Sequence, residues 1–589
     1  MLALVSKDND DRGPALDDKE LNMTKIFGDT NPLSALLRND LKYKIVNGLC
    51  AFRTPDPRST LASAVPSRCP NSSRWLWEQA YSELLIHPVK LEYLKSLGCF
   101  ELPPQETCGQ LLDIYFSRIH PLLPVMDRAE FLSRYYSSDD PPPLILQLAV
   151  FLAASRYTLI SPLSTPSGDT SIRERCDLLH TKLQALCDID LIKDRLPAIQ
   201  ANLLASLHWE GREGINSASD CLSLAIRLAH ELGLHRRRPP NARSRGSQLS
   251  GEETLLKKVW WCLYALDRFN AAQEGTPLLI NEIDCDVEPL TTDDLLGEDL
   301  ITTQTTLYNV SLSLILETAM RSFYSVKADD SNKDWHTRLE IRDRLSGRLD
   351  LLCHQISMTL GGGQPAITTN TTVSSAMMWS LFLQTHLNAV RILIQRPFLT
   401  YLDPSTGTYP CRVQARRHSD EIIHNLNVLR SKNLLRFSWP FTIFSIVSAM
   451  LIYWYDVNDS GFSEQKTIAR SNFELAVECL GDLSGEWWAA AAKHMLGKAL
   501  LRIADSLQVA KNDRGRQAGA PNGVENMDNV EEDGGQESED MLPDAALEPW
   551  VMEPWALDNE DLWQYLGLDF ERDVAQGIFT ILEPNQRTQ

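Results

Sequence analysis

The chain has 589 residues and a formal net charge of −21, with 78 acidic and 57 basic side chains. This length is enough for a sizeable core, and the charge excludes a protein that binds nucleic acid through an overall basic field, because such affinity comes from Lys and Arg neutralising phosphates. The charge is uneven. Residues 517–571 contain sixteen acidic and no basic side chains, which leaves a mildly acidic body of −5.

The twelve cysteines are scattered, and no two show the two-residue gap of a zinc knuckle. Together with the lack of a signal peptide, this predicts an intracellular protein whose thiols act as small core hydrophobes, with no metal site and no cofactor. Two apolar runs, 144–154 and 439–455, are shorter than the ~20 residues of a membrane-spanning helix. We therefore expect buried core helices there and no membrane contact.

Residues 1–70 mix charged, Pro and Ser residues without sustained periodicity, which predicts a loosely ordered extension. A helical domain is expected over 71–515, followed by an acidic aromatic tail over 516–589. In the first half of the domain, apolar periodicity predicts helices at 111–119, 129–136, 144–157, 173–186, 196–209 and 217–232. We expect the helices at 173–186 and 196–209 to form an antiparallel pair, and the run rich in Ser, Thr and Pro at 161–168 to be a loop.

The strongest helical pattern covers 252–272. Ser250 and Glu253 have the spacing of a capping box at its start, and Gly275 with Pro277 ends it. Its apolar stripe is formed by Leu256, Val259, Trp260 and Leu263.

Asp267 and Arg268 interrupt the apolar pattern near the end of this helix. An unpaired charge in a core costs several kcal/mol, so these side chains need partners if they are buried. We interpret them as an internal structural clamp.

The second half of the domain also shows the apolar periodicity of helices. Helices are expected at 302–324, 334–360, 376–395, 418–429, 440–455, 473–480 and 486–506. No segment shows convincing period-two alternation, so the predicted fold is all-α: a large multi-helix regulatory domain with a flexible N-terminal extension and a disordered acidic C-terminal tail.

Four segments of the sequence resemble those of a known family. They are YFSRIHPLLPVMDR at 115–128, LAIRLAHELGLHR at 224–236, KKVWWCLYALDR at 257–268 and QRPFL at 395–399. In order and spacing they resemble the middle homology region of fungal-specific transcription factors, most like the cutinase transcription factor and fatty-acid-responsive regulator branch. The resemblance covers roughly four hundred residues, more than a chance motif match gives.

The resemblance implies a nuclear transcription regulator that is not an enzyme, forms homo- or heterodimers, and controls lipid or carbon-source use or a secondary-metabolite gene cluster. The family carries an N-terminal six-cysteine zinc cluster that binds DNA, but only Cys50 and Cys69 lie in that region here. Zinc is expected only if a cysteine cluster is encoded upstream of Met1. Contact with DNA is otherwise expected through a partner.

A basic cluster follows the helix at 217–232. It consists of Arg236, Arg237, Arg238, Arg243 and Arg245, interrupted by two prolines. Two interpretations remain open: a nuclear-import signal, or arginines that solvate a loop after a helix C-terminus, where cations are favoured.

Two patterns raise the alternative of an all-α metal-dependent enzyme. His230 and His235 are five residues apart, so on a continuous helix they diverge by roughly 140° and do not share a metal as HExxH histidines do. Asp293 and Asp294 are similar to a magnesium-binding aspartate motif, but Gly297 occupies the position one turn on. We expect a helix-end histidine pair and a solvated acidic loop instead.

The acidic tail carries tryptophan and leucine candidates for coactivator docking: Trp550, Trp555, Leu562, Trp563 and Leu566. Acidic neighbours keep such side chains in solvent, and Leu562, Trp563 and Leu566 share one face of a short induced helix. The tail therefore predicts recruitment of transcription machinery or coactivators, or else it packs back on the domain. A further alternative is a co-regulator deficient in DNA binding that acts through a partner.

Overall fold

The structure is a computed structural model. It describes residues 88–137, 141–158, 164–165, 168–169, 172–188, 195–208, 218–237, 251–326, 335–361, 374–403, 406–458 and 463–518. The extension predicted at 1–70 and the aromatic tail residues lie outside these ranges. Within them the fold is all-α as predicted, apart from a minimal antiparallel hairpin of β1 (Ser164–Thr165) and β2 (Gly168–Asp169) in the expected loop.

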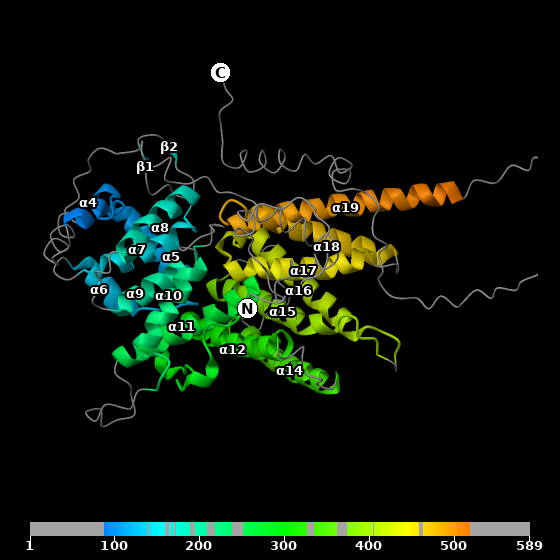
Figure 1. Cartoon of the computed structure of the whole chain (residues 1–589), viewed down its shortest axis with the longest axis horizontal. Coiled ribbons are helices and arrows are strands. Elements are labelled where there is room, and N and C mark those ends of the chain that lie inside the picture. Colours follow the sequence, from blue (N-terminus) through cyan, green and yellow to red (C-terminus); the bar gives the residue numbers. More distant parts are fainter. Residues whose placement is uncertain are drawn as a thin grey trace, which may run out of the picture. The chain divides into compact units, whose positions relative to one another are not determined.

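The helices before and after residue 251 form two groups (Figure 1). The first group comprises α4 (Pro88–Ser96), α5 (Gln105–Arg118), α6 (Arg128–Tyr136), α7 (Leu144–Ser155), α8 (Ile172–Asp188), α9 (Arg195–Ala205) and α10 (Ala218–Glu231). The second comprises α12 (Leu300–Phe323), α14 (Trp335–Thr359), α15 (Ser375–Gln395), α16 (Pro410–Ser431), α17 (Pro440–Asn458) and α18 (Ser463–Asp482). The remaining elements are α11 (Gly251–Glu274), α19 (Trp488–Ala518) and the short 3₁₀ turns η4 (Glu282–Asp284), η5 (Asp293–Leu295), η6 (Arg396–Phe398) and η7 (Leu435–Phe437).

The first group is built on α7, in which every residue is buried. Its two polar side chains are satisfied locally, because Ser155 donates to the Phe151 carbonyl at 2.7 Å and Gln147 to the Pro142 carbonyl at 2.7 Å. Helices α5, α8 and α9 pack against α7, and α10 packs against α9. The expected direct pairing of α8 with α9 is wrong, because α8 packs against α7, and α9 packs against α7 and α10.

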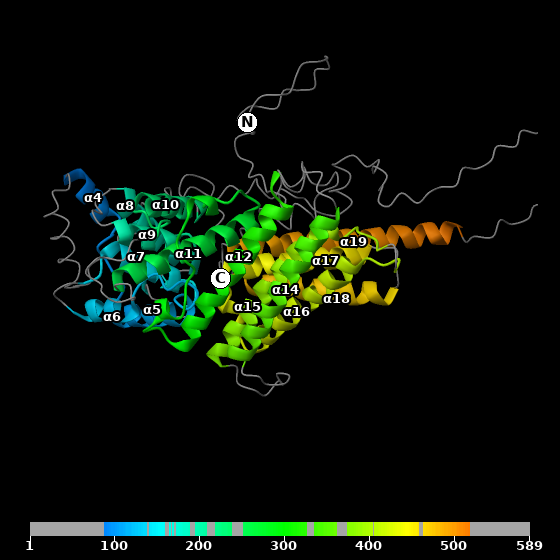
Figure 2. The ribbon, with the colours of Figure 1, turned by 90° about the horizontal axis from the view of Figure 1, so that it is seen from below.

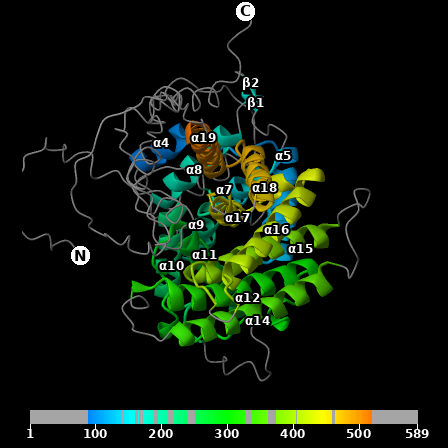
Figure 3. The same ribbon diagram turned by 90° about the vertical axis from the view of Figure 1, so that its right-hand side faces the viewer.

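The second group is built on α15 and α17. Helix α15 packs against α12, α14, α16 and α17, and α17 packs against α18 (Figure 3). Helix α17 is long and apolar enough to cross a membrane, but 78% of its apolar window is buried inside the molecule. Its hydroxyls need no outside partner, because Ser445 and Ser448 donate to the carbonyls of Phe441 and Phe444 one turn earlier.

Helix α11 packs against helices of both groups. It contacts α10 of the first group and α12 and α17 of the second, and Figure 2 shows it between them. Most of its residues are buried, including Trp260, Trp261 and Tyr264. The chain divides into two compact units, Met1–Met495 and Leu496–Gln589, and the contacts described below lie in the first unit.

Candidate functional site

Two oppositely charged side chains are buried in the C-terminal half of α11: Asp267 and Arg268 have exposed fractions of 2% and 0%. The helix ends at Glu274, and Gly275 then adopts a left-handed conformation with φ 71°. A non-glycine residue is strained in this region, so glycine suits the reversal that sends the chain back along α11.

The carboxylate of Asp267 holds the returning segment. Its two oxygens accept from the backbone N–H groups of Leu279 at 3.1 Å and Ile280 at 3.0 Å, and Arg268 Nη1 donates to it at 2.8 Å. Burial raises the pKa of Asp267, while the charge of Arg268 and the two backbone donors oppose that rise. One carboxylate thus fixes the start of the segment that follows α11.

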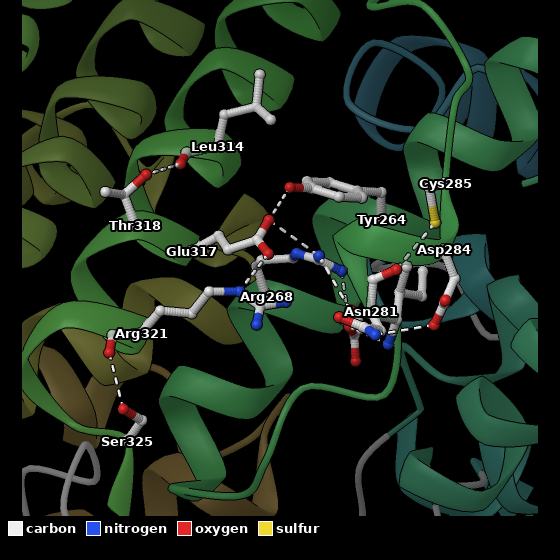
Figure 4. Close-up of polar contacts among 12 residues, drawn as sticks. Tyr264, Arg268, Asn281, Asp284, Cys285, Leu314, Glu317, Thr318, Arg321 and Ser325 are labelled. Atoms are coloured by element: carbon white, nitrogen blue, oxygen red, sulfur yellow. Dashed lines mark hydrogen bonds and ion pairs between the residues drawn. The ribbon is translucent and has the colours of Figure 1, made fainter. Parts of the chain in front are cut away.

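The guanidinium of Arg268 joins three elements (Figure 4). Besides Asp267 it donates through Nη2 to the Ile280 carbonyl at 3.2 Å and to Glu317 Oε2 of α12 at 3.0 Å. It also lies over the ring of Tyr264, with Cζ 3.4 Å from the ring centroid. A fully buried cation therefore has two carboxylates and an aromatic face around it, which offsets its desolvation.

Glu317 completes the network from the side of α12. It accepts from the Tyr264 hydroxyl and from Arg321 Nε at 2.7 Å as well as from Arg268. Burial acts to raise the pKa of Glu317, but Arg268 and the hydrogen bonds outweigh it and the pKa is lowered. Sequence reasoning missed Glu317; the available signal was a lone acid within the apolar run of α12.

A second set of ion pairs holds the remainder of the segment between α11 and α12. Lys257 pairs with Asp294 at 2.7 Å and Lys258 with Glu298 at 3.0 Å, and Glu298 also accepts from His120 at 2.9 Å. Trp261 Nε1 donates to the Glu288 carbonyl at 2.9 Å.

The expectation of a solvated acidic loop at 293–299 is therefore wrong for two of its acids. The side chains of Asp294 and Glu298 are 7% and 6% exposed, because lysines one residue apart on α11 draw them inward. Burial acts to raise the pKa of Glu298, but His120 and Lys258 prevail and lower it to about 2.

The histidine pair behaves differently from a pair on a continuous helix. Gly233 has φ 73° and ends the helix, so the chain curls back and the His230 and His235 ring centroids lie 5.0 Å apart. Both rings also contact Trp260 of α11. Burial and the neighbouring His235 lower the pKa of His230.

Among the described residues, no group of three or more His, Cys, Asp or Glu side chains is arranged so that it could hold a metal ion. The described cysteines are free thiols. Burial raises the pKa of several of them, including Cys187 to about 11, which is the behaviour of core thiols rather than of zinc-binding thiolates. The polar groups around Arg268 bond to one another across α11, the segment that follows it and α12.

The basic cluster is only partly described. Arg236 pairs with Asp286 at 3.2 Å and Arg237 with Glu288 at 3.0 Å, and both arginines are largely exposed. Arg238, Arg243 and Arg245 lie outside the described residues, as do the tail residues Trp550, Trp555, Leu562, Trp563 and Leu566. Their import and activation roles stay predictions.

Helix α11, the segment that follows it and α12 lie within a part of the chain that matches a known family model. Residues 112–354 match the fungal specific transcription factor domain. This segment is therefore similar to a fungal-specific transcription factor domain. The resemblance inferred from the motifs is thereby confirmed, and the matched segment includes both α11 and Glu317 of α12.

The chain is also similar, over part of its length, to named fungal regulators. The chain is 26% identical over 453 residues to cutinase transcription factor 1 alpha of Fusarium vanettenii, covering 73% of this chain and 47% of that protein. It is 30% identical over 207 residues to cutinase transcription factor 1 beta of the same fungus, covering 35% of this chain and 23% of that protein. It is 23% identical over 433 residues to the acetamidase regulatory protein of Aspergillus fumigatus, covering 70% and 51%. At most about half the length of these relatives is spanned by the chain.

Proposed function

We propose that this protein is a nuclear transcription regulator that controls a metabolic gene set. The observation that carries the proposal is the match of residues 112–354 to the fungal-specific transcription factor domain. Relatives named for cutinase and acetamidase regulation support a metabolic target, such as lipid or carbon-source use or a secondary-metabolite cluster. Family membership favours regulation over catalysis.

The proposed division of labour follows the predicted domains. The helical domain over 71–515 regulates and dimerises, with Asp267 and Arg268 as its internal clamp. Because α11 contacts helices of both groups, a clamp at its end is well placed to keep them in one arrangement. The acidic tail over 516–589 recruits coactivators or transcription machinery, and the cluster from Arg236 to Arg245 directs nuclear import.

Contact with DNA is proposed to be indirect, or to use a cysteine cluster outside residues 1–589. No two cysteines of the sequence have the two-residue spacing of a zinc knuckle. A co-regulator that acts through a DNA-bound partner therefore stays within the proposal. Promoter occupancy that disappears when a zinc-cluster partner is deleted would identify this form of the function.

The activation step has a direct test. Residues 517–589 fused to a heterologous DNA-binding domain should activate a reporter gene, and Trp563→Ala with Leu566→Ala should abolish the activity. Gln564→Ala is the matched control, because on a helix it lies off the face shared by Leu562, Trp563 and Leu566. A fusion that is expressed but inactive would remove the activation role of the tail.

A further inference from the structure

Two arginines from distant parts of the chain face the same aromatic ring. Arg118 is the last residue of α5, and its Cζ lies 4.2 Å from the ring centroid of Phe437. Arg436 precedes Phe437 in η7, and its Cζ lies 4.7 Å from the same centroid. Among the described residues, neither guanidinium has a carboxylate oxygen within the 4.0 Å of an ion pair. Two cations thus share one ring without a neutralising anion.

The contacts of Arg118 do not supply negative charge. Its Nη1 donates to the sulfur of Met378 at 3.0 Å, and a thioether is a weak acceptor. Met378 lies in the first turn of α15, and the amino end of a helix carries a partial positive charge. Burial and the nearby charge of Arg436 both lower the pKa of Arg118.

Arg436 has no hydrogen-bond acceptor among the residues that the structure describes. Its Nε and Nη1 atoms are buried and have no hydrogen-bond partner in the structure. The acid that feels its charge is Glu486, whose pKa is raised by burial, an effect that Arg156 and Arg436 oppose. No ion pair joins Arg436 to Glu486, and the Oε2 atom of Glu486 is itself buried without a partner. Unpaired buried donors of this kind cost free energy that an acceptor would recover.

Other arginines in this chain do find acids. Arg430 bonds to Glu478 at 2.8 Å and to Asp482 at 2.5 Å although it lies in a more open position, and Arg412 and Arg416 share Asp456. Arg118 and Arg436 depart from this pattern, although a partly buried guanidinium without an acidic partner costs more free energy than an exposed one.

We infer that Arg118 and Arg436 form a binding site for the carboxylate or phosphate group of a small metabolite. A guanidinium presents parallel N–H donors that match two oxygens of such a group, and two guanidiniums can share one anion. Phe437 holds the site in place, because its ring also contacts Tyr157, whose hydroxyl donates to the Ser438 carbonyl at 3.2 Å. Binding at this site is independent of the proposed role in transcription.

The test measures thermal unfolding of purified residues 1–589 during titration with sodium phosphate or sodium acetate, with sodium chloride at matched ionic strength as the reference. Wild type should show a saturable rise in Tm with phosphate, acetate or both, and the response identifies the preferred group. Arg118→Gln and Arg436→Gln should each weaken the apparent affinity at least ten-fold. Arg417→Gln is the charge-matched control, since Arg417 is 79% exposed and pairs with Glu421.

A folding defect is separable from a binding defect. In chloride, Arg436→Gln should keep or raise the Tm, because it removes one of two cations that repel each other. Glu486→Gln should retain the anion response. The inference is overturned if neither anion gives a saturable effect in wild type, if the Arg118 and Arg436 variants respond as wild type does, or if Glu486→Gln alone abolishes the response.

Discussion

Asp267 shows how a single buried carboxylate directs the path of the chain after a long helix. It accepts hydrogen bonds from two backbone N–H groups and one guanidinium, so both of its buried oxygens have partners. The need for partners could be predicted from the sequence, because two charges interrupt an apolar pattern. The partners could not, because Ile280 and Glu317 reach the site only through the turn at Gly275 and the packing of α12.

Removing this carboxylate should be costly. Asp267→Ala should lower the free energy of unfolding by about 3 kcal/mol or more, because it strands two backbone donors and part of the charge of Arg268. Urea unfolding followed by circular dichroism measures the change. Glu231→Gln is the control, since its exposed pairs with Arg195 and Arg227 should contribute less than about 1 kcal/mol. Equal effects in the two variants would contradict the clamp.

Glu298 gives a pH-dependent prediction. Its pKa is lowered from 4.5 to about 2, so its contribution to stability is fully present above pH 4.5 and is lost as the pH falls toward 2. Glu298→Gln should therefore cost about 3 kcal/mol at pH 6 and roughly half as much at pH 3. Urea titrations of both proteins at the two pH values test this. A difference that does not change with pH would mean that the carboxylate charge contributes nothing.

At the scale of elements, apolar periodicity predicted the existence of the helices better than their ends. Helix α11 was expected at 252–272 and runs Gly251–Glu274. Helix α16 was expected to begin at 418 but begins at Pro410. Its first two turns carry Arg412 and Arg416, which break the apolar pattern because they pair with Asp456 of α17. Proline at the first helical position was the signal for this start.

Replacing glycine by alanine should have opposite effects on stability at two positions of this chain. Gly233 has φ 73°, so Gly233→Ala should destabilise the protein by about 1 kcal/mol through backbone strain, although an added Cβ meets no atom within 4 Å. Gly347 lies on the exposed face of α14 with equal space around it, so Gly347→Ala should stabilise by up to about 1 kcal/mol. Thermal unfolding of the two variants compares them. Shifts of the same sign would contradict this account of the helix end.

At the scale of the whole molecule, the sequence predicted an all-α fold and its family but not the grouping of helices. The position of α11 between the two groups depends on contacts with α10, α12 and α17 that no local pattern encodes. The clamp site was likewise predictable from the sequence only in part. Its charged residues on α11 were visible in the sequence, whereas the inward turn of Asp294 and Glu298 needed the positions of Lys257 and Lys258 in space.

The polypeptide of residues 1–589 should not bind a promoter fragment specifically. Its cysteines lack zinc-knuckle spacing, and residues 517–571 add sixteen negative charges that repel phosphate. The sequence from Arg236 to Arg245 contains two prolines, which disfavour a recognition helix for the major groove. A gel-shift titration at moderate salt, with unlabelled nonspecific DNA as competitor, measures this. Tight binding that resists the competitor would contradict the proposal of indirect DNA contact.

The central claim is that this protein regulates transcription of metabolic genes, and chromatin immunoprecipitation of the tagged protein in its own cells tests it most directly. We expect enrichment at promoters of metabolic genes whose transcripts change when the gene is deleted. Occupancy should persist in a variant carrying Trp563→Ala and Leu566→Ala, because those residues are proposed to recruit coactivators rather than to reach DNA. Absence of promoter enrichment, together with unchanged transcripts in the deletion strain, would contradict the account.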